Sequence, residues 1–509
     1  MVGLAEGRCR RGRDRGRSQR GLRADRLARG RLRPRHGRAA LPLLEAFAGP
    51  DRLPTSHHSA AKRRPIMKRS LVLAGGGMRV AWQTGVVKAL AEEGLAFDHI
   101  DGTSGGILTT AMLLSGLTPD EMVRRWSALT VSNFSSGLPL PDYLKGPWSM
   151  PAFGDADGIR DKVFPALGID PALIRTSSRE GTFNVADFTH KQSIAFDARS
   201  IDVELLAAGM SLPIFMTPLR RDGVVYTDAV WIRDANVSEA LRRGADEIWL
   251  VWCIGNTGYW GDGPLEQYVH MIEMSATGAL LADFAEAAAA GRDFVLHVVK
   301  PTHPLPLDPE YFVGRISSDS LMAMGYRDAR RYLSTMTATG VPADATCTAM
   351  AEPAPGIRYV ENLAAEVAGS ELTLALTVGL PLPGEPGTPE LAGFIDYEPW
   401  GARAFLADGC VHIDGPRITY SARVLHDGAW LDLTARRDLT DNPGWDAFGD
   451  ANTVALTMRG ATTDISADLH LGIGGLARLV AGAEPVATHG LIARADAIRR
   501  VLTEVLGRA

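Results

Sequence analysis

The sequence predicts an α/β domain, with a parallel or mixed sheet covered by helices on both faces, followed by a separate β-rich domain. From Ser70 to about Pro301, short apolar runs alternate with helical stretches, as expected for strands connected by helices. From 358 to 475, short alternating runs recur between Gly, Asp and Pro turns, a pattern typical of antiparallel strands. A chain of 509 residues is long enough for several domains.

The first 66 residues differ in composition from the rest. They hold 17 arginines and one lysine against five acidic residues, a net charge of +13, so the total of −5 leaves −18 on the remainder. Such a segment is too poor in apolar residues to bury a core, and we expect 1–66 to be a disordered or non-native extension. Two other interpretations stay open: a nucleic-acid-binding arm and a targeting peptide. Met67 is a natural start for the strand that follows.

The expected elements follow in order along the α/β domain, which we place at 68–340. "SLVLA" (70–74) predicts a buried strand, 79–94 a helix closed by Gly94, and 106–116 a buried helix. Thr118 and Glu121 form a capping box, with proline at the first helical position. Residues 131–178 lose this regularity. Further strands are expected at 181–190, 192–197, 224–230, 247–255 and 293–301, and further helices at 202–211, 237–243, 264–291 and 318–336.

The β-rich domain is expected at 356–480, and an amphipathic helix closes the chain at 485–509. The four cysteines form no CxxC pair, so neither a disulfide framework nor a metal site is expected. This cysteine usage fits a reducing compartment, and we expect a cytoplasmic protein. No apolar run reaches the roughly 18–20 residues needed to span a bilayer.

Two glycine-rich turns carry the chemistry. Gly75, Gly76 and Gly77 join a strand to a helix, a geometry that points backbone N–H groups at an anion. A dinucleotide-binding fingerprint would need a final glycine where this chain has Val80, which weighs against that interpretation.

The second turn, "GTSGG" at 102–106, satisfies the G-x-S-x-G pattern of a nucleophile elbow. The turn would lift the Ser104 hydroxyl clear of the backbone, with Gly102 and Gly106 permitting the bend; the alternative is an incidental serine capping a helix. The three-glycine turn lies 27 to 29 residues upstream. In a parallel sheet the two turns can lie side by side, so the three glycine N–H groups could stabilise an oxyanion.

A serine nucleophile needs a base. The histidines downstream of the elbow stand in no obvious loop with a paired acid. Asp228 ends a strand and precedes an irregular turn, where partial burial would raise its pKa and let it act as the base. Asp222 and Asp234 are nearby alternatives, although Asp222 precedes Gly223 in a pattern typical of a hairpin turn.

The motifs "GGGMRVAWQTGVVKAL", "GTSGG", "SLPIFMTP" and "YTDAV…GAD" resemble, in order and spacing, the patatin-like phospholipases. The similarity covers roughly 68–300, with a weaker extension to about 336. It implies a three-layer α/β/α sandwich and a Ser–Asp dyad without metal or cofactor. By this resemblance Ser104 is the nucleophile, Asp228 the base, and Gly75, Gly76 and Gly77 the oxyanion turn with Arg79 as its basic member.

The chain departs from the family pattern at two places. Val80 stands where most relatives have glycine, and the family's Asp-Gly-Gly or Asp-Gly-Ala appears as Asp228-Ala229-Val230, which puts full activity in doubt. The C-terminal region faintly resembles the β segment attached to cholesterol-oxidase-like flavoproteins, without a flavin fingerprint. A β module that binds a sterol or acyl chain and a purely structural accessory domain both stay open.

The sequence therefore predicts a serine acyl hydrolase that cleaves carboxylic esters of lipids or phospholipids. The competing hypothesis is a lipid-binding or scaffold protein with a relic site. Peripheral membrane contact is a further expectation, no nucleic-acid partner is expected, and the oligomeric state stays open. Four aromatic residues of the irregular stretch and its approach are candidates for the mouth of a lipid cavity: Trp126, Phe134, Tyr143 and Trp148.

Overall fold

In a computed structural model of the chain, the described residues are 67–134, 136–146, 149–306, 316–439, 452–487, 491–500 and 503. The predicted extension 1–66 lies outside them, as does Trp148. The elements below belong to the described residues.

The first sheet is mixed and has eight strands, ordered β5-β6-β3-β2-β1-β7-β8, with β4 pairing with β3. Its centre is parallel: β1 pairs with β2 and β7, β2 with β3, and β7 with β8. The carboxyl ends of β1 and β2 therefore meet at one edge of the sheet, which brings the two glycine turns together. The strands are β1 (Arg69–Leu73), β2 (His99–Thr103), β3 (Glu180–Asp187), β4 (Gln192–Asp197), β5 (Leu219–Arg221), β6 (Val224–Asp228), β7 (Glu247–Val251) and β8 (Val295–Val299).

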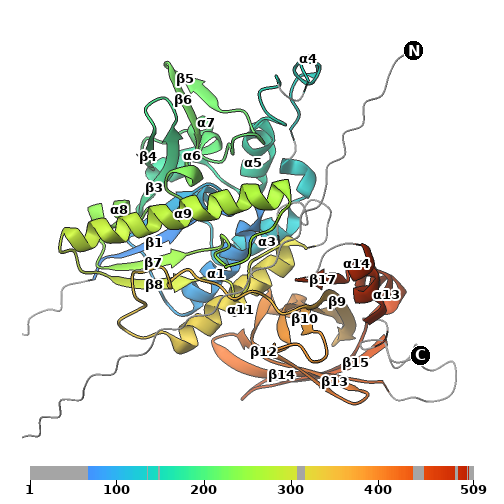
Figure 1. Cartoon of the computed structure of the whole chain (residues 1–509). Helices are drawn as coiled ribbons and strands as arrows, with labels where there is room; N and C mark the ends of the chain where they lie inside the picture. The colour runs from blue at the N-terminus through green and yellow to red at the C-terminus, as the bar shows by residue number, and fades with distance from the viewer. Residues whose placement is uncertain are drawn as a thin grey trace, which may run out of the picture. The chain divides into compact units, whose positions relative to one another are not determined.

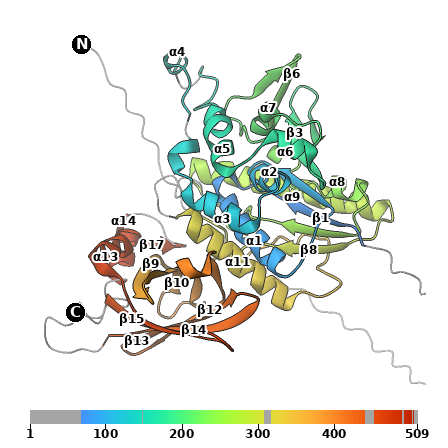
Figure 2. The same cartoon turned by 180° about the vertical axis from the view of Figure 1, so that it is seen from behind.

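Helices cover both faces of this sheet. Because side chains alternate along a strand, Leu71 and Leu73 pack with α1 (Ala81–Glu92), α2 (Gly106–Leu114) and α11 (Ser318–Thr335). Val72 and Ala74 pack on the other face with α8 (Val237–Arg242) and α9 (Pro264–Ala289). Figure 1 shows α9 across one face, and Figure 2 shows α1 and α2 on the side behind it. This three-layer α/β/α arrangement confirms the predicted fold class.

Thr118 caps the start of a helix as the sequence predicts, whereas the Glu121 carboxylate pairs with Arg124 and Arg125. The Thr118 Oγ1 accepts a hydrogen bond from the backbone N–H of Glu121 at 3.2 Å and starts α3 (Pro119–Ala128). The irregular stretch 131–178 holds short helical segments instead of long elements: η2 (Val131–Phe134), α4 (Leu140–Tyr143), η3 (Ile159–Val163), α5 (Phe164–Leu167) and α6 (Pro171–Thr176). Two more follow, α7 (Val203–Ala208) and η4 (Ala229–Trp231). The short 3-10 helix η1 (Gly77–Val80) leads directly into α1.

The second sheet closes on itself. Strands β9 to β16 are antiparallel neighbours in sequence order, and β9 pairs with both β10 and β16, so they form a small eight-stranded barrel. Its strands are β9 (Gly356–Val367), β10 (Ser370–Pro381), β11 (Glu390–Tyr397), β12 (Ala404–Asp414), β13 (Arg417–His426), β14 (Ala429–Asp438), β15 (Thr453–Arg459) and β16 (Asp464–His470). This barrel confirms the expected separate β-rich domain.

The barrel interior holds a packed cluster of apolar side chains and one buried ion pair. Arg437 and Glu361 pair at 2.9 Å with both side chains fully buried, and the Tyr420 hydroxyl donates to Glu361 at 3.0 Å. Helix α13 (Gly472–Ala481) follows the barrel, and the predicted tail contains strand β17 (Glu484–Val486), which pairs with β9, and helix α14 (Leu491–Arg500).

Helix α11 connects the two sheets. It packs closely against α1, where a Cβ at Gly85 would lie 1.9 Å from the Met322 carbonyl oxygen. One turn further along α11, the Tyr326 ring stacks on Phe405 of the barrel with centroids 5.4 Å apart. Arg327, which is buried, pairs with both Asp328 of its own helix and Glu390 of β11. The barrel is therefore bound to the α/β domain through contacts with this one helix.

Candidate active site

The turn predicted to be a nucleophile elbow lies where β2 ends and α2 begins. Ser104 has a φ of 51°, a left-handed conformation that non-glycine residues seldom adopt. The bend brings Gly106 against the end of β1, where a Cβ would lie 2.2 Å from the Leu73 carbonyl oxygen. A Cβ at Gly102 would lie 2.4 Å from the Thr110 hydroxyl oxygen. Both glycines are thus required by close approach of neighbouring atoms.

The Ser104 hydroxyl donates a hydrogen bond to Asp228 Oδ2 at 2.6 Å. Asp228 is the last residue of β6 and is 1 % exposed; its other oxygen accepts from the Val230 N–H at 2.9 Å. Burial raises the pKa of Asp228 to about 7, and the hydrogen bonds from Ser104 and Val230 oppose that rise. A carboxyl group with this pKa is poised to exchange a proton near neutral pH.

The three-glycine turn lies beside this pair, but its first residue does not offer a free donor. The Gly75 N–H donates to both carboxyl oxygens of Asp234, at 2.9 and 3.1 Å, so its expected role toward an oxyanion is wrong. Gly76 and Gly77 have φ values of 155° and 59°, and no acceptor within the described residues takes their N–H groups. The donors left for an oxyanion are those of Gly76 and Gly77.

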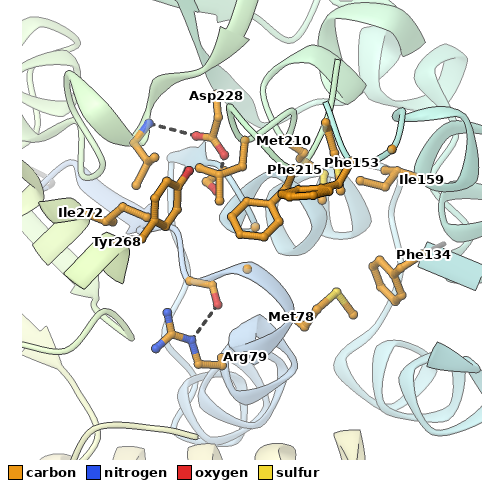
Figure 3. Close-up of a pocket in the computed structure, with 18 of the residues that line it drawn as sticks. Met78, Arg79, Phe134, Phe153, Ile159, Met210, Phe215, Asp228, Tyr268 and Ile272 are labelled. Atoms are coloured by element: carbon orange, nitrogen blue, oxygen red, sulfur yellow. Dashed lines mark hydrogen bonds between the residues drawn. The ribbon is translucent and has the colours of Figure 1, made fainter. Parts of the chain in front are cut away.

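Side chains hold this turn in place from three directions. The Cys253 thiol donates to the Gly75 carbonyl oxygen at 3.0 Å, and Gln83 Nε2 donates to the Ala74 carbonyl oxygen at 2.7 Å. Arg79 is buried, and its Nε donates to the Gly76 carbonyl oxygen at 3.0 Å. Figure 3 shows Arg79 and Asp228 on opposite sides of the cavity. The turn is therefore fixed before any ligand arrives.

The two alternative acids have other surroundings. Asp222 and Gly223 form the turn of the β5–β6 hairpin, with φ values of 53° and 79°. Asp234 is fully buried against Gly75, and burial, together with the negative charge of Asp228, raises its pKa well above the ordinary value. Sequence reasoning treated Asp234 only as a substitute for Asp228, and nothing in the pattern of the chain pointed to its contact with the glycine turn.

An apolar cavity of about 650 Å³ opens beside Ser104 and Asp228. The Phe215 ring lies 5.3 Å from Tyr268 and 6.2 Å from Phe153, centroid to centroid, and these three rings form one wall. Figure 3 shows Phe215 and Phe153 between Asp228 and Phe134, and Tyr268 beside Ile272. Other members of the lining come from α9 and from the segment before β5: Leu265, Val269, Ile272, Met210, Leu212 and Met216. Histidine is absent from the described residues that line this cavity.

The aromatic residues expected at the cavity mouth have different surroundings. Phe134 and Tyr143 line the cavity, whereas Trp126 is fully buried and stacks on Phe134 with centroids 6.5 Å apart. Within the described ranges, no cluster of three or more potential ligating side chains is placed to hold a metal ion. The helices in those ranges are all too short or too polar to cross a bilayer.

A buried polar network supports the elbow from below. Asp101 accepts hydrogen bonds from Asn184 Nδ2 at 2.6 Å and from the Thr182 hydroxyl at 2.5 Å. Asn184 also donates to the Thr103 hydroxyl and accepts from Asn236 Nδ2, which ties β2 and β3 to the start of α8. Sequence reasoning did not find this network, because the hydrogen-bonded partners within it are 52 or more residues apart and share no motif.

Comparison with known families finds similarity in this region. Residues 71–241, about a third of the chain, match the model of the family described as patatin-like phospholipase. An uncharacterized NTE family protein of Mycobacterium tuberculosis is 37% identical over 103 residues, which are 18% of this chain and 17% of that protein. A protein of the same description from Mycobacterium bovis matches equally well. The matched segment thus spans about a sixth of the length of these relatives.

Two solved structures are distantly similar. VipD from Legionella pneumophila gives a TM-score of 0.30 at 13% identity, over 53% of this chain and 67% of that chain. The type III effector ExoU, known from Pseudomonas aeruginosa, gives 0.26 at 16% identity, over 53% of each chain. Similarity at this level defines neither substrate nor mechanism.

Proposed function

We propose that the protein is a serine acyl hydrolase that cleaves carboxylic esters of lipids. The observation that carries this proposal is the 2.6 Å hydrogen bond from the Ser104 hydroxyl to the buried Asp228 at the wall of an apolar cavity. An acyl chain fits such a cavity, because ligand pockets of about 300–1,000 Å³ are typically apolar with a few convergent polar groups. The match to the patatin-like phospholipase family supports the same reaction class.

The reaction begins when ionised Asp228 takes the proton of Ser104 as Ser104 Oγ attacks the ester carbonyl carbon. The N–H groups of Gly76 and Gly77 face the negative charge that develops on the carbonyl oxygen, and each such donor is worth roughly 3–4 kcal/mol. Protonated Asp228 then gives its proton to the leaving alkoxide, which leaves an acyl ester on Ser104. Water, deprotonated by Asp228, attacks this ester, and Ser104 is restored as the fatty acid leaves.

The departures from the family pattern do not disturb this geometry. Val230 supplies its N–H to Asp228, so the Ala229-Val230 pair still orients the carboxylate. Val80 is fully buried, with Cγ1 3.6 Å from the position of a Cβ at Gly76, so it packs beneath the glycine turn. These contacts favour a working site over a relic one.

We further propose that the cavity mouth meets a lipid–water interface. Large apolar side chains are exposed on segments that border the cavity: Leu140, Leu144, Phe153, Ile214 and Phe215. Tyr143 and Phe153 are linked by a hydrogen bond, and the Phe153 N–H donates to the Ile214 carbonyl oxygen, so these segments adjoin one another. Contiguous exposed apolar surface of this kind marks membrane or partner contact.

The test is hydrolysis of a short-chain nitrophenyl ester together with labelling by a fluorophosphonate. Ser104→Ala and Asp228→Asn should each lower kcat/KM on the order of 10⁴-fold, and the label on Ser104 should appear in the wild-type and control proteins but not in these two variants. Ser200→Ala is the matched control, because Ser200 is an exposed turn serine whose hydroxyl bonds only to the Asp197 carbonyl oxygen. Unchanged rates in the two dyad variants would reject the hydrolase, and copurifying lipid without labelling would favour the lipid-binding alternative.

A further inference from the structure

A second apolar cavity, of about 550 Å³, lies away from the dyad. It opens where α1 and α2 end and where the chain enters β2 and β3. Its floor is made of Leu71, Ile100 and Leu114, each at most 2 % exposed. Leu95 and Phe97 form half-buried walls, and Leu173 is 51 % exposed at the mouth. The residues that line the cavity are thus buried at its floor and exposed at its mouth.

This cavity shares no lining residue with the cavity beside Ser104. Leu71 precedes Gly75 by four residues along β1, and Ile100 precedes Ser104 by four residues along β2. At roughly 3.3 Å per residue, each strand separates the two sites by about 13 Å. The second cavity is therefore distinct from the proposed active site.

The mouth carries one positive charge. Arg179 is exposed and is the single charged residue among the described residues that line the cavity. Its guanidinium has no ion pair among the described residues, whereas its backbone N–H bonds to the Ser177 hydroxyl. The nearby carboxylates have other partners: Glu180 pairs with Lys68 at 3.2 Å, and Asp120 pairs with Lys88 at 2.6 Å.

An apolar interior with a cation and hydroxyl groups at its mouth fits a ligand with one hydrocarbon chain and one anionic end. We infer that this cavity is a binding site for a fatty-acid anion, whose chain lies against Leu71, Ile100 and Leu114 and whose carboxylate pairs with Arg179. Among the described residues that line the cavity there is no carboxylate to pair with Arg179. Its charge therefore favours a ligand that carries a carboxylate over a neutral lipid. This inference does not depend on hydrolysis at Ser104.

The experiment uses the full chain carrying Ser104→Ala, so that binding is measured without the proposed nucleophile. A 12-carbon fatty acid with a photoreactive diazirine at its chain end is cross-linked, and the labelled peptides are mapped by mass spectrometry. Labelling is expected on peptides that contain 87–97 and 113–119. In the Ser104→Ala protein, the 12-carbon alcohol should compete with the probe for labelling more weakly than the 12-carbon carboxylate does.

Two variants test the two halves of the site. Arg179→Glu should reduce labelling of these peptides about tenfold, because it replaces attraction by repulsion at the mouth. Ala91→Trp should abolish labelling by filling the cavity from an exposed helical position that tolerates a large side chain. Arg199→Glu is the matched control, since Arg199 is exposed and lies outside the lining. Labelling confined to peptides of the cavity beside position 104, or labelling equal in Arg179→Glu and Arg199→Glu, would overturn the inference.

Discussion

Two buried carboxyl groups beside the glycine turn predict a bell-shaped pH dependence of ester hydrolysis. Asp228 must be ionised to act as the base, and burial raises its pKa to about 7. The rate should therefore fall as pH drops below about 7, and at pH 5 only about one molecule in a hundred would hold the base in its active form. On the acid side, kcat/KM should thus be about 100-fold below its plateau.

We expect the fall in rate at alkaline pH to come from ionisation of Asp234. Burial and the negative charge of Asp228 raise the pKa of Asp234 well above its ordinary value, so its ionisation is opposed while Asp228 is charged. When Asp234 ionises at higher pH, a second negative charge appears against Gly75, next to the donors proposed for the oxyanion. The rate should then fall again, because that charge opposes the one developing on the carbonyl oxygen.

The variant Asp234→Asn distinguishes the contributions of Asp228 and Asp234 to the pH dependence. The amide oxygen can still accept from the Gly75 N–H, but the side chain cannot ionise, so the alkaline limb should disappear while the acid limb stays near pH 7. The assay is kcat/KM for a soluble ester whose leaving group does not titrate between pH 5 and 10. Asp222→Asn, in an exposed hairpin turn, is the control and should keep both limbs. An alkaline limb that persists in Asp234→Asn would refute this reasoning.

Three further predictions concern packing and lipid contact. Gly85→Ala should lower the free energy of unfolding by about 1–3 kcal/mol or more, since its Cβ would meet the backbone of α11, whereas Gly278→Ala, with nothing within 4 Å, should be neutral or slightly stabilising in urea melts. Arg437→Met should cost about 3–5 kcal/mol by leaving Glu361 buried without its partner, and adding Glu361→Leu should recover most of that loss in the same melts. Leu144→Asp should lower the ratio of activity on vesicle lipid to activity on a soluble ester, and an unchanged ratio would argue against the proposed interface.

The sequence predicted the fold class well because the signals were local. Apolar runs such as 70–74 alternate with capped helices, and the Thr118 N-cap appears in the structure where the pattern placed it. The eight antiparallel strands of the barrel follow from alternation and turn residues. Closure of the barrel could not be predicted, because it depends on β9 pairing with strands on both sides, over a long separation in the chain.

At the site, the sequence predicted which residues meet but not how each is used. Ser104 and Asp228 are 124 residues apart, and only the order of motifs linked them before the 2.6 Å contact was seen. The role expected for Gly75 was wrong because Asp234, 159 residues away, takes its N–H. Partners of single backbone groups are set by tertiary packing, and a linear pattern does not record them.

The position of α11 between two cores has a thermodynamic consequence. Arg330 of this helix lies over the Trp430 ring of the barrel, with the guanidinium carbon 5.1 Å from the ring centroid, while the same helix packs on α1. A small molecule that binds only the native α/β layers then stabilises the distant barrel by mass action. The urea midpoint for unfolding of the barrel should therefore rise when a lipid site in those layers is occupied, although the barrel contributes no residue to either cavity lining.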